Sequence, residues 1–298
     1  MFETDLHETD VRERLPELSA FFKESATRLA AAFTARLKES EGGGGGGGGV
    51  AEVDDTSGRA GDEQKVLKTK VGVDDDEQGR DDVRRSLALK LHALREGDDA
   101  RTVKLQHNRG GGGCFPLHYD NPGPPSNRAL TCILYLNPDW SMGDGGELQL
   151  VPFMRRPVRV APRHDRLAVF LSDRVLHRVL PANKERFCLT VWLDGEGVNA
   201  PEDIGLRLPP TAMRDIPGTA EALAATPAQR LLSRAVYPDE YEVSLMECMA
   251  GAEGCSQMLE SHRTHLKAVS GNAPLKALID ALRRLKEQTV DKEDELAL

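Results

Sequence analysis

The sequence predicts a mainly β core, an eight-stranded double-stranded β-helix (jelly roll), with N-terminal helices before it and an α-helical extension after it. Between residues 101 and 194, eight short runs of β-type residues are separated by Gly, Pro and Asp turns. No stretch with helical spacing interrupts them, and helical spacing returns after Pro201. Regularly spaced short strands are typical of a β-sandwich or barrel, and eight is the number that a jelly roll uses.

The eight expected strands are connected by short turn-forming segments. In chain order they are RTVKLQH, CFPLHYD, ALTCILYLN, GELQLVPF, PVRVAP, RLAVFL, LHRVLP and RFCLTVWLD. Their β-branched and aromatic residues favour extended backbone, and the intervening turn residues end each strand. We therefore expect all eight strands to belong to one jelly-roll core.

The chain divides into three regions by composition. Residues 1–63 combine an expected helix within 11–40 with a glycine run and an acidic stretch, which together predict a flexible linker. Residues 64–200 hold the jelly roll and an amphipathic leading helix expected at 81–96. Residues 201–298 form a helical extension that packs on or beside the barrel. Its expected helices are 219–236, 239–250, 256–269 and 273–288. We expect its HxxH pair, His262 and His265, to lie at the surface.

Composition and charge exclude several classes of protein. The net charge of −9 argues against a general nucleic-acid-binding protein. No window approaches the roughly 18 uninterrupted apolar residues of a membrane span. The acidic N-terminus also lacks the apolar segment of a secretory signal, so we expect a cytoplasmic or nuclear location. Residues 101–200 nevertheless carry 13 Lys+Arg against 9 Asp+Glu, a net +4. Five arginines between residues 155 and 166 form either a solvated face or a surface that attracts an acidic protein substrate.

The five cysteines do not form a recognisable metal-binding or redox motif. They are scattered along the chain, and no CxxC pair is present. Cys132 and Cys188 lie inside the apolar runs LTCILYL and FCLTVWL. We interpret them as small buried hydrophobic residues in a reducing compartment.

One strand carries two potential metal ligands. In the run His118-Tyr119-Asp120, residues i and i+2 point to the same face of the strand, so His118 and Asp120 can bind one ion. A later strand supplies His177 near its start. Two histidines and one carboxylate form the facial triad of non-haem iron(II) sites, which leaves positions open for a co-substrate and oxygen. The sequence therefore predicts an iron(II) site at His118, Asp120 and His177.

The strand at 186–194 offers a second binding feature. Period 2 places Arg186, Thr190 and Trp192 on one face, together with Cys188. On the run 129–137 the same rule places Tyr135 on one face with Thr131 and Ile133. An unpaired buried guanidinium is very costly, whereas a dicarboxylate could pair with it at one end and chelate the metal at the other. The alternative is an internal salt bridge of Arg186 with Glu147 or Asp173.

These motifs together resemble the 2-oxoglutarate/iron(II) oxygenases, and more closely their prolyl 4-hydroxylase branch, which includes the oxygen-sensing prolyl hydroxylases. The resemblance covers residues 101–195 and rests on HYDN, LTCILYLNPDW, GDGGELQL, DRLAVFLSDRVLHRVLP and ERFCLTVW. It implies that His118, Asp120 and His177 are the iron ligands. It also implies that Arg186 binds the far carboxylate of 2-oxoglutarate with help from Tyr135. The positions that line the same pocket in the family match Thr190, Trp192 and Leu148.

The resemblance further implies a dioxygenase that hydroxylates a C–H bond of a peptidyl proline, while 2-oxoglutarate is decarboxylated to succinate. Iron(II), 2-oxoglutarate and oxygen would be required, with ascorbate as an accessory reductant and a protein or peptide as substrate. Phe115 and Asn108 stand where oxygen-sensing members carry tyrosines. Two alternatives remain: the same chemistry on another side chain or a small molecule, or a non-catalytic cupin-like module. A zinc hydrolase is disfavoured because no general-base carboxylate stands at a recognisable spacing.

Overall fold

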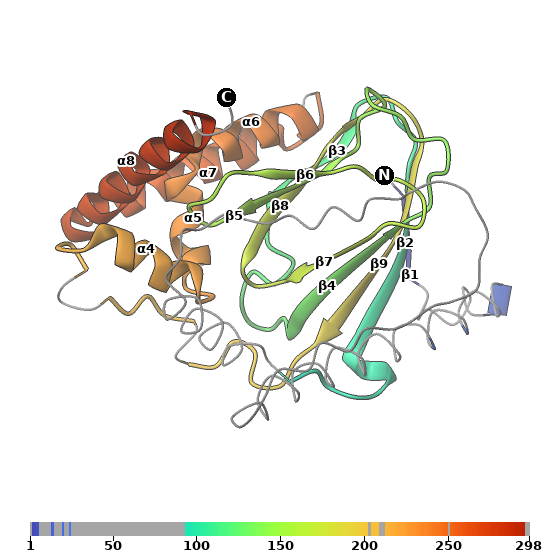
Figure 1. Ribbon diagram of the computed structural model, residues 1–298, viewed down its shortest axis with the longest axis horizontal. Coiled ribbons are helices and arrows are strands. Elements are labelled where there is room, and N and C mark those ends of the chain that lie inside the picture. Colours follow the sequence, from blue (N-terminus) through green and yellow to red (C-terminus); the bar gives the residue numbers. More distant parts are fainter. Residues whose placement is uncertain are drawn as a thin grey trace, which may run out of the picture.

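The computed structural model describes residues 2–5, 13–14, 20, 24, 93–201, 204–208, 212–249 and 251–295. Two antiparallel sheets face each other, and the C-terminal helices pack beside the smaller sheet (Figure 1). Each of the eight expected strands is present between residues 101 and 194. The predicted jelly-roll class, with a mainly β core and a C-terminal helical extension, is thereby confirmed.

The larger sheet has five strands in the order β1-β2-β9-β4-β7. The bounds are Phe2–Asp5 for β1, Arg101–Asn108 for β2, Arg186–Asp194 for β9, Arg128–Tyr135 for β4 and Leu167–Leu171 for β7. Strand β1 was not anticipated, and it pairs with β2 at the edge of the sheet. The central strand β9 pairs along its length with both β2 and β4, which holds its inward-facing side chains firmly in register.

The smaller sheet has four strands in the order β3-β8-β5-β6. The bounds are Gly113–His118 for β3, Val175–Ala182 for β8, Leu148–Pro152 for β5 and Val158–Val160 for β6. Strand β3 is therefore an edge strand with β8 as its one sheet neighbour among the described strands. Its pairing with β8 is irregular, with register shifts on both sides of Phe115.

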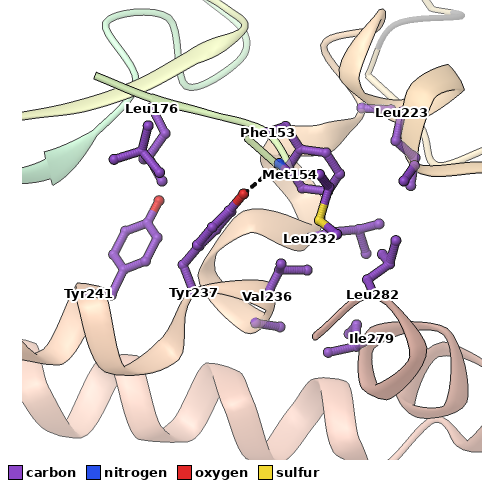
Figure 2. Close-up of a cluster of buried hydrophobic side chains, with 14 of the residues drawn as sticks. Phe153, Met154, Leu176, Leu223, Leu232, Val236, Tyr237, Tyr241, Ile279 and Leu282 are labelled. Atoms are coloured by element: carbon purple, nitrogen blue, oxygen red, sulfur yellow. Dashed lines mark hydrogen bonds between the residues drawn. The ribbon is translucent and has the colours of Figure 1, made fainter. Parts of the chain in front are cut away.

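Three buried clusters hold these layers together. Between the sheets lie Ile133, Tyr135, Leu148, Ala168, Phe170 and Cys188. The outer face of the larger sheet carries a second cluster, which includes Cys132, Leu189 and Val191. A third cluster joins the outer face of the smaller sheet to the helices, as Figure 2 shows for Leu176 beside Tyr241 and for Phe153 beside Tyr237. The alternation expected for residues 186–194 is thus observed: Cys188 faces inward, and Leu189 and Val191 face outward.

The C-terminal region is helical as expected, with one difference. Its helices are α4 (Ile216–Ala224), α5 (Gln229–Val236), α6 (Pro238–Met249), α7 (Cys255–Ser270) and α8 (Ala273–Glu295). The single helix expected at 219–236 is wrong, because the chain breaks into α4 and α5 around Pro227. Proline lacks the N–H that a continuous helix needs and clashes with the preceding turn.

Other expectations fall largely outside the described residues. Four described residues within 11–40, Glu13, Arg14, Ala20 and Glu24, are helical, and the glycine run lies outside the described part. The helix expected at 81–96 is wrong for residues 93–96, which are not helical, and Leu94 forms an isolated β-bridge with Gly195. Residues 81–92 lie outside the described residues. A short 3-10 helix at Asp98–Ala100 leads into β2. In the part of the chain that the structure describes, no helix combines the length and apolar character needed to cross a bilayer.

Two features of the helical region differ from expectation. Cys114 on β3 and Cys248 on α6 form a disulfide across 134 residues of sequence, whereas Cys132 and Cys188 are buried free thiols. His262 is only 1% exposed rather than at the surface, because it packs against Tyr241 and contacts the Pro238 carbonyl. Both features tie α6 to its neighbours.

Candidate metal centre and active site

Three potential metal ligands meet at one end of the sandwich. His118 ends β3, His177 lies on the neighbouring β8, and the two residues are direct partners in the register. Asp120 follows two residues after His118, on the same side of the chain. Its carboxylate lies 3.4 Å from His118 Nε2 and 3.6 Å from His177 Nε2. The candidate ligand atoms of all three residues lie within 4.8 Å of one another.

Backbone contacts orient both imidazoles for metal binding. The His118 Nδ1 atom lies 2.8 Å from the Pro116 carbonyl oxygen, and the His177 Nδ1 atom lies 3.0 Å from the Val175 carbonyl oxygen. Because a carbonyl can only accept, each Nδ1 must carry the proton in these contacts. Each Nε2 atom is therefore directed toward the carboxylate side, and this is the atom through which such a histidine would bind a metal.

The Asp120 carboxylate is also held by the hydroxyl group of Thr131. Thr131 on β4 donates a hydrogen bond of 2.7 Å to Asp120 Oδ2, and its hydroxyl also lies 2.8 Å from Ser172 Oγ. Burial by itself would raise the pKa of Asp120, but hydrogen bonding and charge interaction with His118 and His177 lower it well below its usual range. The carboxylate is therefore ionised and available as an anionic ligand.

The two histidines differ in exposure. Burial, with a further contribution from His118, lowers the pKa of His177 to about 4. Its imidazole is therefore neutral at physiological pH, which is the form that binds a metal ion. The His177 side chain is 4% exposed, and Phe170 packs edge-on against it at 4.7 Å between ring centroids. The His118 side chain is 37% exposed. The centre is thus open on the His118 side and closed on the His177 side.

Arg186 lies deeper between the sheets, at the start of β9. It is 3% exposed, and its Nε donates to the Gly146 carbonyl oxygen at 2.8 Å. Its guanidinium carbon lies 5.1 Å from the centre of the Tyr135 ring. Among the described residues no carboxylate forms a salt bridge with Arg186. Asp173, one of the two partners considered from sequence, lies 3.6 Å from its neighbour Arg174 instead.

The buried phenol of Tyr135 complements this guanidinium. Tyr135 is 0% exposed, and its hydroxyl completes no hydrogen bond with the described residues even though Arg186 lies beside it. Burial raises the pKa of Tyr135 to about 12, so the hydroxyl stays protonated and can donate. A buried cation beside an unused donor fits a carboxylate ligand. Two imidazoles and a carboxylate likewise fit iron(II). The residues present therefore fit both iron(II) and 2-oxoglutarate.

Of the other predicted pocket residues, Leu148 and Thr190 lie near this pair, and Trp192 lies farther along β9. Leu148, on β5, is fully buried in the cluster between the sheets that contains Tyr135. Thr190, on β9, donates to Gln106 Oε1 at 3.1 Å. Trp192 is also inward-facing and buried, but it pairs in the register with Thr131, the residue that holds Asp120. The Arg128 guanidinium lies 4.1 Å above its ring.

The sequence did not predict the contacts by which several further residues support the site. Thr131 was expected only to share the Tyr135 face, but it holds the Asp120 carboxylate. Gln106 on β2 accepts hydrogen bonds from Thr190 and Cys188. Gly146, with a φ of 74°, leaves no room for a Cβ atom, which would lie 2.9 Å from Arg186 Cδ. The GDGGELQL motif contained this glycine, and period 2 on β2 could have indicated Gln106.

Comparisons with known proteins agree with this geometry. Residues 103–194 match the family model of the 2OG-Fe(II) oxygenase superfamily. Over 86 residues the chain is 42% identical to the hypoxia-inducible factor prolyl hydroxylase of Caenorhabditis elegans, covering 28% of this chain and 12% of that protein. It is 41% identical over 86 residues to human Egl nine homolog 1, covering 28% of this chain and 20% of that protein. The matched segment thus spans well under half the length of these curated relatives.

A solved structure extends the similarity to nearly the whole chain. A prolyl 4-hydroxylase from Phytophthora capsici is 42% identical, with a TM-score of 0.72, covering 96% of this chain and 78% of that one. This match includes the helices beyond the family model as well as the jelly roll. The chain therefore belongs to the 2OG-Fe(II) oxygenase superfamily, in its prolyl 4-hydroxylase branch.

Proposed function

We propose that this protein is an iron(II)- and 2-oxoglutarate-dependent dioxygenase that hydroxylates a proline within a peptide or protein. One observation carries the proposal: the His118–Asp120–His177 triad and the buried Arg186–Tyr135 pair face the same interior from opposite sheets. A structural metal site would not need a second, carboxylate-binding group. Family membership in the prolyl 4-hydroxylase branch supports the choice of substrate.

The site residues form two groups with different roles. His118, Asp120 and His177 would hold iron(II), and Arg186 with Tyr135 would hold the far carboxylate of 2-oxoglutarate. When bound, iron(II) couples oxygen activation and decarboxylation of 2-oxoglutarate, to succinate and carbon dioxide, with insertion of one oxygen atom into a C–H bond. The protein contributes orientation and exclusion of water. Thr131 fixes the carboxylate ligand, and Phe170 and Leu148 keep the interior dry.

The substrate would approach from the His118 side, where the centre is open. Phe115 lies near this opening, 5.9 Å from the His118 ring between centroids, and provides an apolar wall for a pyrrolidine ring. Asn108 has a different task. It is 2% exposed, donates to the Gly113 carbonyl and accepts from the Gly110 N–H, so it stabilises the β2–β3 turn.

Charge provides a further element of substrate recognition. Five exposed arginines lie on β6 and on the segments before and after it: Arg155, Arg156, Arg159, Arg163 and Arg166. A cluster of cations on a chain of net charge −9 favours substrates with acidic residues beside the proline. Because exposed charges are screened by salt, we expect this preference to weaken as ionic strength increases. We also propose ascorbate as the reductant that keeps iron in its active state.

Mass spectrometry tests the function directly. The full chain is incubated with iron(II), 2-oxoglutarate, ascorbate and a library of proline-containing peptides, half with acidic and half with basic flanks. We expect a gain of one oxygen atom on proline, faster for acidic flanks at low salt, and no gain with the Asp120→Ala variant. Oxygen added only to other residue types or to small molecules would refute the proline assignment. Absence of any 2-oxoglutarate turnover with all substrates would favour a non-catalytic binding module.

A further inference from the structure

The strand that carries the iron ligands is poorly supported within its own sheet. Strand β3 lies at the edge of the four-stranded sheet and pairs irregularly with β8. Asp120 lies beyond its last residue, His118. A metal site needs its ligands held to within about 0.5 Å of the productive geometry. An irregular edge strand and the loop after it require support from elsewhere in the molecule.

Helix α6 supplies the first part of that support. The Leu117 N–H, immediately before His118, donates a hydrogen bond of 3.1 Å to Ser244 Oγ. Ser244 is fully buried, and its hydroxyl donates in turn to the Tyr241 carbonyl oxygen at 2.9 Å. The Cys114–Cys248 disulfide joins the same helix to the start of the same strand. Helix α6 therefore occupies the side of β3 where a further strand would otherwise pair.

Helix α5 holds the residues around Asp120. The Tyr119 hydroxyl, on the residue between the two ligands, lies 2.6 Å from Ser233 Oγ, and both groups are buried. Arg230 donates through Nη1 to the carbonyl oxygen of Asn121 at 2.7 Å and to its Oδ1 at 3.0 Å. The same guanidinium donates to Asn199 Oδ1 at 2.8 Å. The residues directly before and after Asp120 are thus each bonded to α5.

These contacts follow the alternation of the segment. His118 and Asp120 face the candidate metal, while Tyr119 faces the helices and packs in the cluster between helices and sheet. We propose that Ser233, Ser244 and Arg230 are positioning residues for the iron ligands, and that α5 and α6 form the rigid support of the HxD segment. The inference rests on the proposed function, because it takes His118 and Asp120 to be ligands.

Binding of cobalt(II) to the metal-free full chain tests the proposal without relying on activity. Cobalt(II) gives visible absorption bands that report both its affinity and its coordination geometry. The test variants are Ser233→Ala, Ser244→Ala and the double variant. The matched control is Tyr237→Phe, which removes a hydroxyl that accepts a 2.7 Å hydrogen bond from the Met154 N–H (Figure 2). That bond also joins the helices to the smaller sheet, but next to β5 rather than β3.

We expect the double variant to bind cobalt(II) about tenfold more weakly than the parent, the lower end of the range for partners of metal ligands. Its absorption bands should also shift, and each single variant should show a smaller effect. Tyr237→Phe should lose thermal stability and keep the parental affinity and spectrum. In turnover assays, the serine variants should lower kcat at saturating iron while leaving the KM for 2-oxoglutarate unchanged, because Arg186 is not attached to the helices.

Two outcomes would overturn the proposal. Serine variants that bind cobalt(II) with parental affinity and spectrum would show that the helices only stabilise the fold. If Tyr237→Phe lowers cobalt(II) affinity as much as the serine variants do, the effect comes from a general loss of stability and not from loss of the support of β3. The Asp120→Ala variant distinguishes failure of the proposed function from failure of this inference. If the parent binds cobalt(II) no better than Asp120→Ala does, the triad assignment is wrong and the inference falls with it.

Discussion

The two sheets of the sandwich divide the candidate site between them. The four-stranded sheet carries both histidines of the triad, and its outer face is covered by the C-terminal helices. The five-stranded sheet carries Arg186 and Tyr135, and its outer face has a separate apolar cluster. The two histidine ligands and the co-substrate pair therefore lie on different sheets, each with its own apolar cluster on the outer face, and Thr131 of the larger sheet holds Asp120 between them. Substitutions at the triad should change metal affinity, and substitutions at Arg186 and Tyr135 should change the affinity for 2-oxoglutarate.

The largest effect should come from the carboxylate between the two histidines. Asp120→Ala removes the only anionic ligand, so metal affinity should fall by more than the roughly 10- to 100-fold typical of mere partners of ligands. We expect 2-oxoglutarate turnover, measured as succinate, to fall below detection while circular dichroism shows a folded protein. His107→Ala is the matched control, because this histidine stacks on Phe187 away from the triad. Undiminished succinate formation by Asp120→Ala would contradict the assignment.

A smaller effect, confined to the other sheet, should follow from replacing the guanidinium. Arg186→Lys keeps the positive charge but loses the two-pronged contact with a carboxylate. The contact contributes roughly 1.5–3 kcal/mol, so the KM for 2-oxoglutarate should rise about ten- to a hundredfold. Cobalt(II) affinity should stay at the parental value, since no triad residue contacts Arg186. An unchanged KM would place the co-substrate carboxylate elsewhere.

Tyr135 should show a weaker effect of the same kind, with a distinctive pH dependence. An ordinary tyrosine ionises near pH 10, but burial raises the pKa of Tyr135 to about 12. The hydroxyl therefore remains a donor from neutral pH up to about pH 10. Tyr135→Phe should raise the KM for 2-oxoglutarate by one constant factor across that range. A parental KM that climbs toward the Tyr135→Phe value as pH approaches 10 would mean that the phenol ionises normally.

The smallest effect should come from the N-terminal region. Removing residues 1–61 takes away β1, which pairs with β2 through backbone contacts at the edge of the larger sheet. No triad or pocket residue is lost, so turnover of 2-oxoglutarate should remain close to that of the full chain, with a modest loss of thermal stability. Succinate assays and melting curves on the two proteins provide the measurement. A well-folded but inactive truncation would show that the N-terminal region completes the active site.

The sequence indicated the barrel and the chemistry better than the support around them. Strand alternation correctly divided residues 186–194 between the two faces, and the i, i+2 spacing brought His118 and Asp120 to one side. Both patterns are local, so they can be read directly. The contacts of Ser233 with Tyr119 and of Ser244 with Leu117 span more than a hundred residues and follow no local pattern. The Cys114–Cys248 disulfide could not be predicted for the same reason, because 134 residues separate the two cysteines. The break between α4 and α5 could have been predicted from Pro227.

Labelled oxygen gas tests the central claim most directly. The full chain, supplied with iron(II), 2-oxoglutarate, ascorbate and a proline-containing peptide, is given ¹⁸O₂, and both products are analysed by mass spectrometry. We predict one heavy oxygen atom in the hydroxylated proline and one in succinate, in equal molar yield, with neither product formed by Asp120→Ala. Succinate without hydroxylated proline from any peptide, or product oxygen derived from water, would contradict the account.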